Sequence, residues 1–320
     1  FIPTDADNSS LPAGGIEYSF KNTGTSKVDA IFSYNSVNFM GQQNGKALIR
    51  PLSNGFILSE TGVKDKPETK GDFAIFTNEP GIIVDHCWFR GGWWDPLTTT
   101  WNTILKTESR STPPVENPAP GASIYVPFAL EPGETREIRV MMAWYVPDTN
   151  LKYGKDSEEA DEEECNDPDC ACKDPFYMPW YSGKFGSVEE VVNYWKTNYD
   201  DLNKKSRLFS DSFYSNTLPP EVTEAIAANL TILKSPTVLR QRDGKLWNWE
   251  GCGDNSGCCA GSCEHVWNYA QAIPHLFPKL ERTLRETEFG PSQDREGHQT
   301  FRSALPIRPV ATTFYAASDG

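Results

Sequence analysis

Asp243 to Tyr269 read DGKLWNWEGCGDNSGCCAGSCEHVWNY, a run that gathers three tryptophans, four cysteines, Glu250, Glu264 and His265. Such a combination is typical of a sugar site, because an aromatic ring covers the apolar C–H face of a pyranose while a carboxylate attacks the anomeric carbon or holds hydroxyl groups. The alternative is a cysteine-rich structural turn, in which the glycines let the backbone bend sharply. Residue chemistry alone leaves both interpretations open.

Sequence on both sides of this run resembles one family of glycosidases. The resemblance is to glycoside hydrolase family 116, the family of bile-acid β-glucosidase, also called non-lysosomal glucosylceramidase. It is carried by Trp249-Glu250-Gly251-Cys252, Gly257-Cys258-Cys259, His265–Ala272, Phe277–Arg282, Leu284–Phe289 and, upstream, Phe128–Glu134 and Ala143–Pro147. It implies a retaining β-glycosidase, acting on β-glucosides or glucosylated lipids, with an N-terminal β-sandwich and a C-terminal (α/α)6 barrel.

The resemblance also implies roles for single residues. Glu250 matches the family's catalytic nucleophile, and Trp249 precedes it in the motif. Glu264 stands where some members have an aspartate that binds sugar hydroxyls, and His265 is the neighbouring alternative. Adjacent side chains on a helix point about 100° apart, so we expect only one of these two to face the substrate.

Two departures from the family pattern accompany these matches. The family's acid/base aspartate lies further along than Gly320, so the resemblance implies a fragment that lacks the C-terminal part of the catalytic domain. A histidine that binds hydroxyls in other members is expected near Leu305-Pro306, where Ile307-Arg308 follow instead. A non-catalytic carbohydrate-binding or structural module is therefore the alternative function.

Length and charge narrow the class of protein. A chain of 320 residues and 35.8 kDa is long enough for two domains. The net charge of −14 excludes nucleic acid as an expected partner and disfavours an anionic membrane surface. No apolar run approaches the roughly 20 residues of a membrane span. The absence of an initiator methionine and of a signal peptide indicates a processed chain or a fragment. Compartment, whether cytoplasmic or secreted and periplasmic, and oligomeric state stay open.

Most of the eight cysteines form two clusters. Neither cluster contains the CxxC pair that indicates zinc most strongly, so we assign no metal-ligating residue and expect no cofactor. For the sulfurs themselves, disulfides, free thiols and metal ligation all stay open. Calcium is the one ion considered, because Asp167 and Asp169 lie in an acidic insert, although their spacing matches no EF-hand. The clustered cysteines are Cys165, Cys170 and Cys172, and Cys252, Cys258, Cys259 and Cys263.

The first half of the chain predicts strands. Short runs rich in Val, Ile, Phe and Tyr end in Gly, Pro or Asn, without long helices between them, which is typical of an antiparallel β-sandwich. Trp88, Trp93, Trp94 and Trp101 lie close to Cys87 in sequence and are either core residues or a wall facing sugar. The expected strands are 16–20, 28–34, 56–59, 73–77, 82–85, 124–130 and 137–144.

Helical signals begin at Ser187. Ser187 and Glu190 form a capping box, and Pro219-Pro220 opens a second helix whose expected buried stripe includes Val222 and Ile226. We therefore expect residues 1–185 to form the β-sandwich, 186–216 a linker helix, and 217–320 the start of an (α/α)6 toroid.

Overall fold

The computed structural model describes residues 1–41, 46–93, 95–154, 176–249, 262 and 272–309. The chain divides into two compact units. The strand-rich unit comprises Pro12–Pro147 and Phe185–Thr197, and the helical unit comprises Phe1–Leu11, Asp148–Lys184 and Asn198–Gly320.

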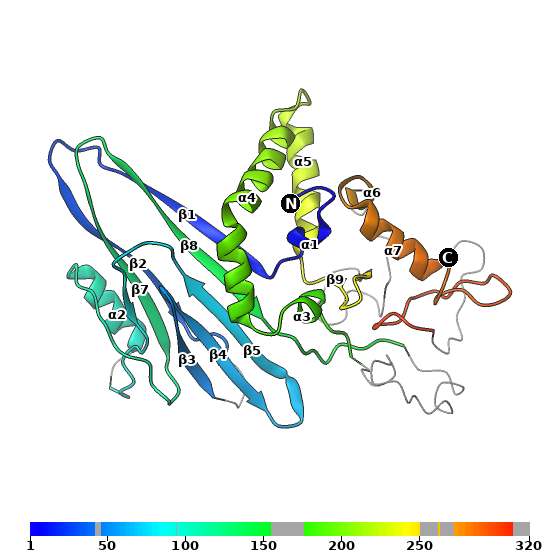
Figure 1. The fold of residues 1–320 in the computed structure, drawn as a ribbon, viewed down its shortest axis with the longest axis horizontal. Coiled ribbons are helices and arrows are strands. Elements are labelled where there is room, and N and C mark those ends of the chain that lie inside the picture. Colours follow the sequence, from blue (N-terminus) through cyan, green and yellow to red (C-terminus); the bar gives the residue numbers. More distant parts are fainter. Residues whose placement is uncertain (42–45, 94, 155–175, 250–261, 263–271, 310–320) are drawn as a thin grey trace. The chain divides into compact units, whose positions relative to one another are not determined.

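Two antiparallel sheets make up the strand-rich unit (Figure 1). One has the strand order β1-β8-β5-β4-β3 and the other the order β2-β7-β6. The strands are β1 (Ala13–Lys21), β2 (Val28–Val37), β3 (Ala47–Leu52), β4 (Gly55–Val63), β5 (Lys66–Phe76), β6 (Ile83–Asp85), β7 (Gly121–Leu130) and β8 (Thr135–Tyr145). All seven predicted strands are present, and β3 is an addition to them.

The two sheets pack face to face because alternate residues of each strand are apolar. Phe56 and Leu58 of β4 meet Ile124 and Val126 of β7 in one buried cluster. Successive side chains of a strand point to opposite faces, so Ser123 and Tyr125 of β7 lie on the outer face of the smaller sheet. The expected antiparallel β architecture of the first half is confirmed.

One helix of ten residues interrupts the strands, between which no long helix was expected. Helix α2 (Pro96–Leu105) lies beside β2 and β7 (Figure 1). Its start was readable in the sequence: Asp95 accepts hydrogen bonds from the amides of Leu97 (3.2 Å) and Thr98 (3.0 Å), and Pro96 fits the first turn. The four threonines of the helix, which are poor helix formers, obscured it.

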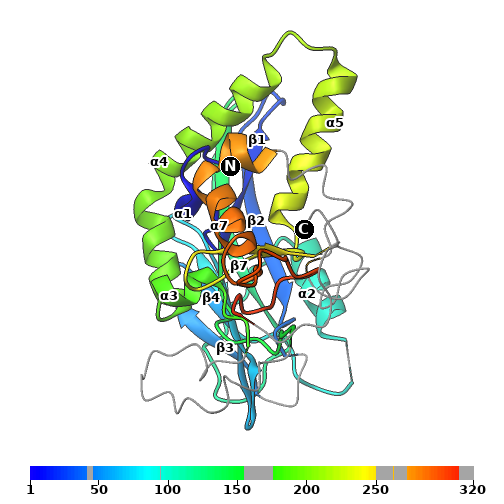
Figure 2. The same ribbon diagram turned by 90° about the vertical axis from the view of Figure 1, so that its right-hand side faces the viewer.

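The helical unit contains short elements and part of one long helix. Helix α4 (Val188–Tyr214) begins at the predicted cap, where the Ser187 hydroxyl accepts from the Glu190 amide at 3.3 Å. A short turn joins it to α5, and the two run in opposite directions (Figure 2). The other elements are α1 (Ala6–Ser9), α3 (Trp180–Lys184), α5 (Pro220–Leu230), the 3-10 helix η3 (Thr231–Lys234), β9 (Val238–Arg240), β10 (Leu246–Asn248), α6 (Ala272–Leu276) and α7 (Pro278–Glu288).

The stripe expected to be buried on the second predicted helix, which also included Leu230 and Leu233, is buried only in part. Val222 and Ile226 are exposed by 43% and 42%, whereas Leu230 is buried and Leu233 packs partly buried against a core cluster. Helical spacing predicted the helix correctly, but spacing does not say whether another element packs on the stripe.

An ion pair joins α4 to the larger sheet within the strand-rich unit. Arg50 of β3 donates from Nη1 to Glu189 at 2.6 Å and from Nη2 to Asp72 at 2.9 Å. Glu189 lies in the first turn of α4, where the helix dipole also favours a negative charge. Burial raises the pKa of Glu189, but the hydrogen bond and charge of Arg50 lower it by more, so its pKa lies below the usual value.

Glu189→Gln is therefore expected to destabilise the protein by about 0.5–1 kcal/mol at pH 7, since the pair is partly exposed and screened by water. Because the folded-state pKa is lowered, this contribution is complete above the unfolded carboxyl pKa of about 4.3 and disappears as the pH falls through the folded value. Urea unfolding at pH 7 and pH 3 measures it. Glu137→Gln, on an exposed position of β8, should change stability at neither pH. A Glu189→Gln effect of equal size at both pH values would contradict the ion-pair explanation.

Candidate functional site

Of the four predicted site residues, the structure describes only Trp249. Glu250, Glu264 and His265 lie outside the described residues, as do Trp94 and both cysteine clusters. Cys87, the remaining cysteine, is buried with a free thiol. The site is therefore built from the residues that lead into and out of the motif.

A two-stranded hairpin leads into the motif. Strands β9 and β10 pair antiparallel, with Trp247 opposite Leu239 and Asn248 opposite Val238. The turn between them contains Gly244, whose φ of 93° a glycine adopts without strain. This hairpin fixes the backbone up to Trp249, whose amide donates to the Thr237 carbonyl at 3.1 Å.

Trp249 is a core residue in the described structure. Its ring lies edge-on to Trp247, with 5.0 Å between centroids and an angle of 77°. It is 3% exposed, in a cluster with Tyr177, Leu305 and Ile307. The resemblance leads one to expect a histidine near Leu305. At this place the chain has Leu305 and Ile307, which supply apolar packing. The substrate-binding role of Trp249 stays a prediction.

Polar atoms without partners lie next to this cluster. The side chain of Asn248 is completely buried, and neither Oδ1 nor Nδ2 has a hydrogen-bond partner in the described part of the chain; the same holds for Nε1 of Trp249. A buried polar group without a partner costs about 1–3 kcal/mol, so such groups call for a specific reason. Sequence reasoning did not single out Asn248, although an amide between two tryptophans at the end of an apolar strand was a usable signal.

The two sides of the run 250–261 meet at Ser303. Trp247 Nε1, before the run, donates to the Ser303 carbonyl at 3.4 Å. Ser262, after it, accepts from the Ser303 amide at 2.7 Å through its hydroxyl. A further hydrogen bond holds the segment around Ile307, whose amide donates to the side chain of buried Gln241 at 2.8 Å. The flanks of the motif are therefore tied to one scaffold.

Arg240 of β9 joins the hairpin to the N-terminal segment and to α3. Its Nη2 lies 2.7 Å from Asp7 Oδ1, its Nη1 donates to Ser10 Oγ at 3.1 Å, and its guanidinium lies 4.3 Å from the centroid of the Trp180 ring. Asp7 and Ser10 belong to the N-terminal segment around α1, so the arginine joins that segment to β9. These contacts give Arg240 a structural role.

One cluster of described residues has the composition of a metal site. Asp294, Glu296 and His298 bring their ligand atoms within 4.8 Å of one another. Asp294 Oδ1 already accepts from the amides of Glu296 (2.9 Å) and His298 (2.8 Å), and Oδ2 lies 3.0 Å from His298 Nδ1. The cluster is exposed, and its hydrogen bonds are those of a tight turn. Asp167 and Asp169, considered for calcium, lie outside the described residues.

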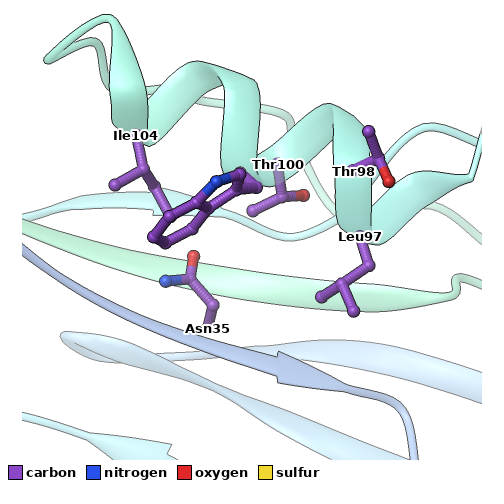
Figure 3. Close-up of a pocket in the computed structure, with 6 residues that line it drawn as sticks. Asn35, Leu97, Thr98, Thr100 and Ile104 are labelled. Carbon is purple, nitrogen blue, oxygen red and sulfur yellow. The ribbon is translucent and has the colours of Figure 1, made fainter.

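A groove in the strand-rich unit lies between α2 and the smaller sheet (Figure 3). Its volume is about 410 Å3, and it is lined by Asn35, Leu97, Thr98, Thr100, Trp101 and Ile104. The tryptophans near Cys87, for which core packing and a wall facing sugar were the alternatives, differ in burial. Trp88 is buried and donates to Ser123 Oγ at 2.8 Å, whereas Trp101 and Trp93 are exposed by 57% and 91%.

Comparison with known proteins supports one family for this chain. A sequence model described as "beta-glucosidase 2, glycosyl-hydrolase family 116 N-term" matches residues 1–202, which is more than half of the chain. The match covers the strand-rich unit and ends within α4. No curated protein matches the chain. Among the helices of the described residues, none combines the length and apolar character that a membrane crossing requires.

Proposed function

The chain belongs to glycoside hydrolase family 116, and we propose that it works in a retaining β-glycosidase that hydrolyses β-glucosides or glucosylated lipids. In this proposal Glu250 is the nucleophile, and residues 217–320 begin an (α/α)6 catalytic domain in which α5, α6 and α7 are early helices. Residues 1–185 are the β-domain, and 186–216 are the linker helix. The matched family supports the class of reaction, and the motif at Trp249-Glu250-Gly251 supports the residue.

The chemistry proceeds in two displacements. The Glu250 carboxylate attacks the anomeric carbon while an acid protonates the departing glycosidic oxygen, so that a glycosyl ester forms and the alcohol leaves. The same acid, now a base, takes a proton from water, which attacks the anomeric carbon and returns Glu250 as a carboxylate. Retaining enzymes hold the two carboxyl groups about 5–5.5 Å apart. By the family resemblance, an aspartate has the acid/base role.

The observation that carries the proposal is the pair of unpartnered polar groups beside the motif. Asn248 and Trp249 immediately precede Glu250, and three buried polar atoms of theirs lack partners among the described residues. Active sites hold such groups ready, because a substrate hydroxyl or a catalytic carboxylate completes their hydrogen bonds. We propose that Trp249 and either Glu264 or His265 bind the sugar, and that Asn248 completes this polar lining.

The stereochemistry of the product tests this function. We expect the full-length protein to hydrolyse an aryl β-glucoside and to release β-glucose first, as proton NMR recorded before mutarotation shows. Release of α-glucose first would indicate an inverting enzyme and would contradict the two-displacement mechanism. Saturable binding of the glucoside without any turnover would instead identify a carbohydrate-binding module.

A further inference from the structure

Helix α2 buries polar side chains and exposes apolar ones, the reverse of the usual pattern. Thr100 and Thr103 are its buried residues, whereas Leu97, Trp101 and Leu105 are exposed by 54%, 57% and 64%. The threonine hydroxyls are satisfied within the helix, since Thr100 donates to the Pro96 carbonyl at 3.0 Å and Thr103 to that of Thr99 at 3.2 Å. A helix that only had to cover the sheet would bury its apolar residues. Of these exposed apolar residues, Leu97 and Trp101 line the groove.

The floor of the groove carries a fixed amide. Figure 3 shows Asn35 of β2 beneath the helix residues. Asn35 Oδ1 accepts from Ser123 at 2.7 Å, and Nδ2 donates to Ser33 at 3.1 Å. Ser123 is held in turn by the indole of buried Trp88. These bonds fix the amide plane and leave one N–H of Nδ2 and one lone pair of Oδ1 for a further partner.

We propose that this groove is a binding site for one pyranose unit of a gluco-configured oligosaccharide, stacked on Trp101 and hydrogen-bonded to Asn35. A β-glucose ring has equatorial hydroxyls, so its faces carry C–H groups that pack on an indole, while its edge offers adjacent donors and acceptors to an amide. The groove volume of about 410 Å3 lies within the usual range of small-ligand sites.

The Asn35 amide favours sugar over an acyl chain, although the rest of the exposed lining is mostly apolar. An acyl chain in the groove would remove water from the Asn35 amide without replacing its hydrogen bonds, which opposes binding. Asp95 at the start of α2 and the net charge of −14 disfavour anionic ligands such as phosphate headgroups. The site lies wholly within the strand-rich unit, so the inference does not depend on the role of Glu250.

A site-specific test uses full-length protein labelled with 5-fluorotryptophan and titrated with cellotetraose. The fluorine resonance that Trp101→Phe removes is assigned to Trp101, and we expect it to shift saturably with the sugar. The resonance that Trp93→Phe removes should stay in place, because Trp93 does not line the groove. By calorimetry, Trp101→Ala should weaken this binding about tenfold, whereas Trp93→Ala should leave it within about twofold. Asn35→Ala should weaken it as well.

The outcomes separate this proposal from the proposed function. Turnover of an aryl β-glucoside should be the same in Trp101→Ala as in the parent, and lack of turnover in the parent would leave the Trp101 shift unaffected. A Trp101 resonance that does not move up to millimolar sugar would overturn the proposal. So would a shift produced by phosphatidylcholine vesicles rather than by cellotetraose, since it would identify an apolar ligand. Circular dichroism confirms that each variant folds.

Discussion

Replacing Glu250 by glutamine is expected to lower turnover of aryl β-glucosides by the full-length protein by about 1,000-fold or more, which is a loss of about 4 kcal/mol of transition-state stabilisation. Glutamine keeps the size of the side chain but cannot form the glycosyl ester, so the first displacement fails. Folding should be unchanged, because the substitution removes a charge without changing volume. Initial rates, together with the urea midpoint of the same preparation, measure both expectations.

Covalent trapping identifies the residue independently. A 2-deoxy-2-fluoro-glucoside with a good leaving group should add one glycosyl unit to the parent protein, and peptide mapping should place it on Glu250. Glu264→Gln is the matched control: it should raise KM or lower kcat by less than Glu250→Gln and should still accept the label. A label on another carboxylate would falsify the nucleophile assignment.

The strands were predictable because the sandwich obeys a strictly local pattern. In β7, alternation correctly predicts that Ile124 and Val126 face the other sheet, but it does not predict that Ser123 and Tyr125 between them are buried as well. Strand β3 contains Arg50 and Pro51, which weaken the apolar pattern and explain why it was missed. The strand exists because it pairs with β4, a contact that lies outside its own sequence.

Tertiary contacts decided what local pattern did not. Val222 and Ile226 of α5 are exposed, and α2 buries threonines while it exposes apolar residues. Both patterns depend on which elements pack on each helix, and the spacing of apolar residues does not say which element that is. Among the predicted site residues, Trp249 was chosen for its aromatic face, whereas the described structure packs that face on Trp247. Asn248 was overlooked because a single amide between two tryptophans is a weak signal, whereas its complete burial without a partner among the described residues is a strong one.

Trp247→Ala is expected to have the largest effect on stability, a loss of about 3–5 kcal/mol for a large buried side chain replaced by a methyl group. Trp247 is 2% exposed, packs on Trp249 and donates to the Ser303 carbonyl, so the substitution removes packing on the hairpin and one tie across the motif at once. The usual stability of a domain is only about 5–15 kcal/mol, so this loss should unfold the helical unit under mild conditions. Hydrogen exchange resolved by peptide measures it.

Amides of β9 and β10 should exchange much faster in this variant, while those of β4 and β7 should keep their protection, because the sandwich core contains no residue of the hairpin. Trp247→Phe retains most of the packing and should lose less, and Trp93→Ala should lose almost nothing because its side chain is exposed. At low temperature the folded population should recover. If glucoside turnover recovers with it, the hairpin affects catalysis only through its effect on stability. Normal hydrogen exchange together with abolished turnover would contradict that interpretation and would place Trp247 in contact with the substrate.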